Sequence, residues 1–180
     1  MKLLNKLSNH ANQKTLFISI ILMVLFMGVI LPLEASAYAE VSNGLSAPDT
    51  MIFYTADWLY ELANQLGEAG RRYYIISRLR FDIAWPLVFT LFFFISMALL
   101  FKTSSKKRFL LILPILGLLF DFLENVLVSI VFMCYPNQTM LAHLAGVFTF
   151  LKWVFIVVTL IIIFTGVIIK GIISLKKARE

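Results

Sequence analysis

Hydrophobic positions along this chain gather into long continuous runs instead of the alternation expected of a half-buried strand. The runs occupy about residues 16–33, 81–101, 109–135 and 141–169. A helix needs about 20 apolar residues to cross the hydrocarbon core of a bilayer. The pattern therefore predicts four transmembrane helices. The short connections KTSSKKR and PNQTM make the last three antiparallel to their chain neighbours.

The long segment between the first two runs, residues 34–80, has a different period. From Ser46 the sequence SAPD fits a capping box, S-x-x-D, which signals the start of a helix. Apolar side chains then recur at helical spacing, and the opposite stripe carries polar residues: Asp57, Glu61, Asn64 and Glu68. We expect an amphipathic helix over about 49–67, ended by Gly67 or Gly70, that lies on the membrane surface or covers one end of the bundle.

Composition places the chain in one class. Of its 180 residues 61% are hydrophobic and 14% are charged, and the mean hydropathy is +0.90. This apolar content is well above that of an ordinary soluble domain. The predicted fold class is an all-α membrane protein, an antiparallel four-helix transmembrane bundle with an extracytoplasmic amphipathic helix. Residues 1–180 form a single membrane domain in this prediction.

The first apolar run has two interpretations. Lysines precede it, and Ala35-Ser36-Ala37 fits an A-x-A cleavage signal, so it could be a signal peptide. Against that, the run over 16–33 is longer than the ~7–15 apolar residues of a signal peptide. Length favours a retained helix, and both interpretations place the following segment outside.

Basic residues beside the apolar runs indicate the orientation of the chain. One side of a four-span topology carries Lys2, Lys6, Lys14, Lys102, Lys106, Lys107, Arg108, Lys170, Lys176, Lys177 and Arg179, and the other carries Arg71, Arg72, Arg78 and Arg80. The excess of basic residues marks the cytoplasmic side. We therefore expect a multi-pass protein of the plasma (cytoplasmic) membrane with both termini in the cytoplasm.

The same placement explains the formal charge of +6 without nucleic acid as a partner. Membrane lipids are the expected partners, together with a second copy of the chain or another membrane protein. A single cysteine, Cys134, and two histidines form no CxxC or His/Cys cluster, so we expect no metal site and no cofactor. No P-loop, GxSxG, HExxH or dinucleotide fingerprint is present in the sequence.

Polar residues inside the third and fourth apolar runs are the strongest functional signal. In LFDFLENVL, Asp121 and Asn125 fall on one helical face with Glu124 beside them, near mid-membrane depth. Lys152 lies at a similar depth in the fourth run, on a face of small residues. Because a charge facing lipid is costly, these faces should meet inside the bundle, with Lys152 against Asp121 or Glu124.

A second polar pair lies nearer the outer side. Arg78 and Asp82 are four residues apart and can pair along one helical face. Pro86 removes the helical donor for the Asp82 carbonyl and predicts a kink there. Lys152 alone does not balance the charges of Asp121 and Glu124. Either one of the two carboxylates is protonated, or Arg78 or Arg80 supplies the second positive charge.

Three motifs carry a resemblance to a known group of proteins. GEAGRRYYIISRLRFDIAWP (67–86), LPILGLLFDFLEN (113–125) and FTFLKW (148–153) resemble small bacterial four-span integral membrane proteins with the patterns G-R-x-x-Y, D-x-x-x-P and F-D-x-x-E-N. The resemblance covers about residues 54–153 and implies a bacterial inner membrane protein, but no particular activity. By position it points to Gly70, Arg71, Tyr74, Asp82, Pro86, Asp121, Glu124 and Asn125.

Three functions fit the predicted pocket, which comprises Arg71, Tyr74, Arg78, Asp82, Asp121, Glu124, Asn125 and Lys152. The first is binding or transport of a small amphiphile, lipid or proton. The second is a structural or assembly role in which the buried charges serve packing alone. The third is a membrane-embedded lipid-modifying enzyme with Asp121 or Glu124 as general acid or base. The sequence leaves these alternatives open.

Overall fold

The protein is an all-helical bundle in a computed structural model that describes residues 2–102 and 105–178. The elements are α1 (Lys2–Ser8), α2 (Gln13–Leu25), the π-helical turn η1 (Phe26–Ile30), α3 (Leu31–Ser42), the 3-10 turn η2 (Pro48–Thr50), α4 (Ala56–Leu100), the 3-10 turn η3 (Ser105–Leu111), α5 (Ile112–Cys134) and α6 (Leu141–Lys177). Arg179 and the side chains of Lys2 and Lys106, which belong to the predicted orientation signal, lie outside the described part.

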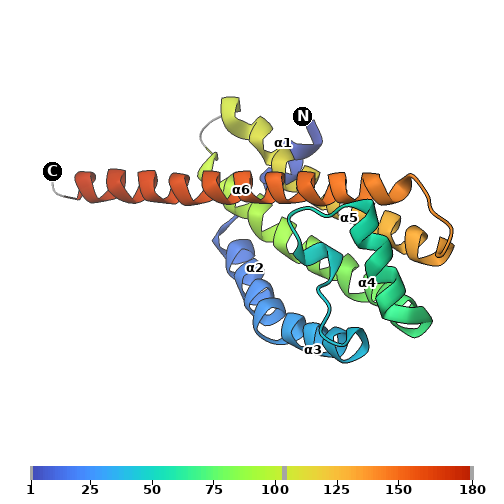
Figure 1. The fold of residues 1–180 in the computed structure, drawn as a ribbon. Helices are drawn as coiled ribbons and strands as arrows, with labels where there is room; N and C mark the ends of the chain where they lie inside the picture. The colour runs from blue at the N-terminus through green and yellow to red at the C-terminus, as the bar shows by residue number, and fades with distance from the viewer. Residues whose placement is uncertain (1, 103–104, 179–180) are drawn as a thin grey trace.

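Four stretches of helix in the described ranges are long and apolar enough to cross a membrane. They are Gln13–Ser42, Ala56–Leu100, Lys107–Cys134 and Leu141–Lys177. They confirm the predicted class, an all-α multi-pass membrane protein built as a four-helix bundle. Figure 1 shows α6 running along the whole molecule, with its C-terminal end extending past the other helices.

The first span continues beyond residue 33, where its apolar run ends, as far as Ser42. Its middle is a π-helical turn immediately before Pro32. Proline lacks the N–H of an ordinary helical bond and its ring crowds the preceding turn, so a local π-turn lets the helix continue. Stacking of Phe26 on Phe81 and Trp85 holds this span against α4.

The amphipathic helix forms the first part of α4 and covers one end of the bundle. Its apolar side, which includes Leu59, Leu62 and Leu66, is buried in the main hydrophobic core, and Asp57 and Glu61 are exposed. A break follows at Gly67, whose φ of 62° is left-handed and therefore suits glycine. The sequence predicts that the amphipathic helix ends at Gly67 or Gly70, and the structure has the break at Gly67.

The predicted start of this helix is wrong. The SAPD segment forms only the short turn η2, without a side-chain cap, and α4 begins at Ala56 instead of near residue 49. The N-cap is Thr55, whose side chain accepts a hydrogen bond from the backbone N–H of Trp58. Beyond Gly67, α4 continues without interruption through Pro86, and its non-helical backbone lies at Gly67 alone among the described residues of α4.

Residues 43–55 form a loop that enters the bundle against α6, and we call it the inserted loop. The indole Nε1 of Trp153 donates to the carbonyl of Met51 at 2.7 Å, and Tyr54 is 3% exposed. A β-carbon on Gly146 would lie 2.1 Å from the Tyr54 carbonyl oxygen. Glycine at 146 is therefore what lets the loop backbone lie directly on α6.

Gly146→Ala should displace the inserted loop and lower the free energy of unfolding by about 1–3 kcal/mol, the range for overpacking a filled site. The matched control is Gly171→Ala on the same helix, where an added β-carbon meets nothing within 4 Å. Thermal unfolding in detergent micelles compares the two variants. A loss in Gly146→Ala no larger than in Gly171→Ala would contradict this packing.

Candidate functional site

Lys152 lies between two carboxylates of α5. Its Nζ is 2.5 Å from Glu124 Oε2 and 3.3 Å from Asp121 Oδ1. All three side chains are buried, with Glu124 at 0% exposure. Gly117 of α5 lies against Phe155 and Ile156 of α6, and its lack of a side chain lets the two helices approach closely. The prediction that Lys152 faces these carboxylates across the α5–α6 seam is confirmed.

Arg78 forms a second group of ion pairs on the α4 side. Its Nη1 pairs with Asp82, the neighbour four residues along the helix, and lies 3.1 Å from Asp49 Oδ2. Its guanidinium also lies over the ring of Tyr74, with Cζ 4.3 Å from the centroid. The predicted Arg78–Asp82 pair is present, whereas Arg80 is exposed.

The inserted loop joins the two groups. Lys152 Nζ donates to the Asp49 carbonyl oxygen at 3.3 Å, while the Asp49 carboxylate pairs with Arg78. From the same loop, the Tyr54 hydroxyl donates to Glu124 Oε1 at 3.4 Å. Together these side chains form one network, which we call the charge cluster: Asp49, Arg78, Asp82, Asp121, Glu124 and Lys152.

Asp49 and Tyr54 are members of the site that the sequence does not predict. The sequence places Asp49 in the capping box of a surface helix. In the structure its carboxylate pairs with Arg78 instead. Burial of Asp49 acts to raise its pKa, but the charges of Arg78 and Lys152 outweigh burial and hold the pKa below its ordinary value. Burial and the Glu124 carboxylate raise the pKa of Tyr54, which keeps its hydroxyl a donor. The usable signal is that Asp49 is the single charged residue in the sequence 43–55.

The remaining predicted residues separate into two groups. Asn125 joins the cluster, because its Nδ2 donates to Asp121 Oδ2 at 3.3 Å, and Tyr74 is fully buried beside Arg78. Arg71 does not reach the cluster. Its Nη1 donates to the Ala63 carbonyl at 2.7 Å, in the turn before the break at Gly67, and its guanidinium lies over Tyr135. The break at Gly67 leaves the Ala63 carbonyl available as an acceptor. Arg71 bonds to it and therefore lies at the end of the bundle.

The formal charges of the cluster do not balance. Four carboxylates, Asp49, Asp82, Asp121 and Glu124, face two cations, Arg78 and Lys152. An uncompensated charge away from water is strongly unfavourable. Asp49 is 26% exposed, but the three buried carboxylates still outnumber the two cations. The cluster in this form therefore requires a bound proton or an added positive group.

A groove between α4 and α5 opens beside the cluster, and we call it the α4–α5 groove. Its volume is about 550 Å³ and its lining comprises Ile75, Arg78, Leu79, Asp82, Ile83, Phe122, Asn125, Val126, Ser129, Ile130 and Met133. The outer rim is exposed and apolar: Leu79 is 66% and Met133 is 62% exposed. In a bilayer this rim faces acyl chains, so the groove is open to the hydrocarbon.

The surface of the groove is almost entirely apolar, and the polar side chains beneath it are buried and belong to the network. Arg78 and Asp82 are members of the cluster, and Asn125 bonds to it. Asn125 Oδ1 is buried and accepts no hydrogen bond from any residue in the described part of the chain. A buried acceptor of this kind needs a donor, which a water molecule or a ligand can supply. No set of three His, Cys, Asp or Glu residues in the described ranges is arranged to hold a metal ion.

Comparison with protein-family models, curated proteins and solved structures gives no significant match to this chain. The interpretation of the site therefore depends on its geometry.

Lys152→Met should lower the free energy of unfolding by about 3–5 kcal/mol, because it leaves two buried carboxylates without their cation. Adding Glu124→Gln to Lys152→Met should restore part of that loss, since one of the unpaired charges is then removed. Chemical unfolding in micelles measures Lys152→Met, Glu124→Gln and the double variant, with Lys176→Met at the exposed end of α6 as control. A double variant as unstable as the sum of the two single changes would contradict the pairing.

Asp49→Asn should destabilise the protein in a pH-dependent way. The folded-state pKa of Asp49 lies below its ordinary value, so its stabilising effect is complete above about pH 4, near the unfolded-state pKa. The effect is lost as the pH falls through the lower folded-state pKa. The gap in unfolding free energy between wild type and Asp49→Asn should therefore close below about pH 4. A gap independent of pH would show that Asp49 acts without its charge.

Proposed function

We propose that the protein binds an amphiphile in the α4–α5 groove, with a hydrogen-bond-donating, positively charged polar group against the charge cluster. The observation that carries this proposal is that Arg78, Asp82 and Asn125 serve both the groove and the network. An apolar tail would lie along the lipid-facing rim. The polar group would displace the apolar lining over the Asp82 carboxylate and the unpaired Asn125 Oδ1, both of which are buried.

The surplus of carboxylates explains the preferred sign of the ligand. A cationic group would compensate charge that protons otherwise compensate, so binding would release protons from the cluster. A carboxylate ligand would add to the surplus and should be rejected. An amphiphile and a proton, both of which the sequence allows as ligands, would thus share one site and exchange there for one another.

The proposed setting is the plasma (cytoplasmic) membrane of a bacterium, with both termini cytoplasmic. The Lys and Arg distribution supports this orientation, and the resemblance to small bacterial four-span proteins supports the source. In this orientation the inserted loop and the first part of α4 lie on the outer side. The groove then opens in the outer half of the bilayer. A second copy or another membrane protein remains a proposed partner.

Ligand stabilisation in micelles tests the proposal. A long-chain primary amine should raise the unfolding temperature more than the alcohol of equal chain length, and the matched carboxylic acid should not raise it. At a hundredfold excess over Kd, the amine should contribute about 2.7 kcal/mol. Asp82→Asn should lose the effect, whereas Asp57→Asn, at an exposed acid outside the groove, should keep it.

Val126→Trp provides a second variant that leaves every charge in place. It should fill the groove and abolish the response to the amine while the protein remains folded. Equal stabilisation by amine and carboxylic acid would contradict the proposal. So would full retention of amine binding in Val126→Trp, and the structural or assembly role would then be the better account of the cluster.

A further inference from the structure

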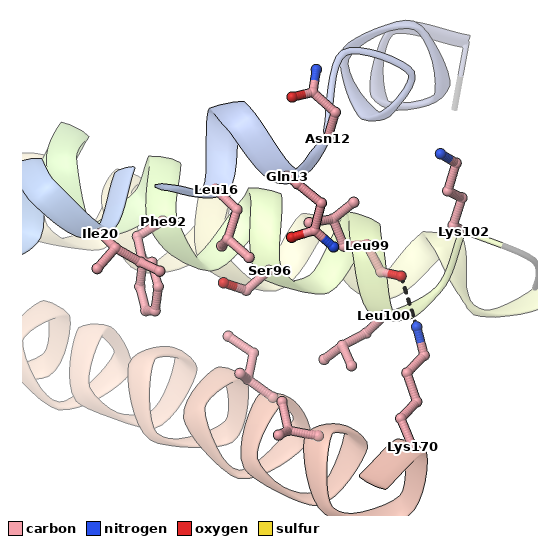
Figure 2. Close-up of a pocket in the computed structure, with 12 residues that line it drawn as sticks. Asn12, Gln13, Leu16, Ile20, Phe92, Ser96, Leu99, Leu100, Lys102 and Lys170 are labelled. Carbon is pink, nitrogen blue, oxygen red and sulfur yellow. Dashed lines mark hydrogen bonds between the residues drawn. The ribbon is translucent and has the colours of Figure 1, made fainter. Parts of the chain in front are cut away.

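A second recess lies at the opposite end of the bundle, between α2, α4 and α6. Its volume is about 570 Å³. Figure 2 shows Lys102 and Lys170 at one end of it and Ile20 and Phe92 at the other. The recess is therefore polar and basic at one end and apolar along the rest of its length.

The depth of the recess matches one leaflet. Phe92 precedes Leu100, the last residue of α4, by eight residues, which corresponds to about 12 Å along the helix, and Lys102 lies two residues beyond. That distance approaches half of the ~30 Å hydrocarbon core. A chain lying along Phe92 would thus reach the middle of the bilayer while its polar end stays beside the lysines.

The charge of the recess is positive. Lys102 follows the end of α4 and Lys170 comes from α6, so two basic residues from separate segments lie at the same end of the recess. Lys170 Nζ donates to the Leu99 carbonyl at 2.9 Å, which holds the ammonium at the α4 side of the recess (Figure 2). No described residue that lines the recess carries a carboxylate, and Gln13 places the positive N-terminal end of α2 nearby.

We infer that this recess binds an anionic phospholipid, with the headgroup phosphate between Lys102 and Lys170 and one acyl chain along Phe92. A phosphate would compensate the charges of the two lysines, and an acyl chain would fill the apolar length of the recess. The inference concerns a different end of the bundle from the α4–α5 groove and does not depend on the proposed function. It places an anionic-lipid site on the side of the membrane where both termini of the chain lie.

Native mass spectrometry of the full chain, delipidated in micelles, tests the inference. Phosphatidylglycerol should bind more tightly than phosphatidylcholine with the same acyl chains, and inorganic phosphate should not compete. The double change Lys102→Gln and Lys170→Gln should weaken phosphatidylglycerol binding about 25-fold, or fivefold for each lysine, equivalent to ~1 kcal/mol each. The control, Lys176→Gln with Lys177→Gln, makes the same charge change farther along α6 and should bind normally.

Ser96→Leu tests the apolar part separately, because Ser96 lines the recess and carries no charge. It should reduce phosphatidylglycerol binding while leaving the lysines unchanged, with helicity monitored by circular dichroism. Unchanged binding in Ser96→Leu would overturn the inference. Equal binding of the two lipids, an equal loss in the Lys176 and Lys177 control, or competition by inorganic phosphate would overturn it as well.

Discussion

The need to compensate charges that are shielded from water organises this molecule. Lys152 on α6 pairs with Glu124 and Asp121 on α5, and Arg78 on α4 pairs with Asp82. Arg78 and Asp82 pair within α4, whereas Lys152 and its two carboxylates lie on different helices and cannot pair within one helix. Only the assembled bundle brings the partners together, so the charges fix which helix faces which.

The inserted loop completes this arrangement and depends on a few small residues. Its Asp49 reaches both cations, through its carboxylate to Arg78 and through its carbonyl to Lys152. Gly146 leaves the space in which the loop backbone lies on α6. The loop brings a fourth carboxylate to the cluster. Packing at one glycine and the charge balance of the cluster are linked in this way.

Sequence reasoning predicts the features that periodicity and local spacing determine. The four apolar spans, the Arg78–Asp82 pair and the facing of Lys152 with Asp121 and Glu124 follow from helical geometry and from the cost of charge in lipid. The path of residues 43–55 does not follow, because an irregular loop has no period and its contacts come from α4 and α6, distant in sequence. For the same reason Asp49 and Tyr54 are missed. Arg71 is misplaced because the break at Gly67 provides a nearer partner, the Ala63 carbonyl.

The seam between Lys152 and Glu124 is the contact on which this account depends most, and solid-state NMR in lipid bilayers can measure it directly. With ¹⁵Nζ-lysine and ¹³Cδ-glutamate labels, dipolar dephasing should report one lysine in ion-pair contact with a glutamate carboxylate, as the 2.5 Å Nζ to Oε2 distance requires. The signal should disappear in Lys152→Arg, which keeps the charge but removes the label. Absence of dephasing in the wild type, or its persistence in Lys152→Arg, would contradict the account.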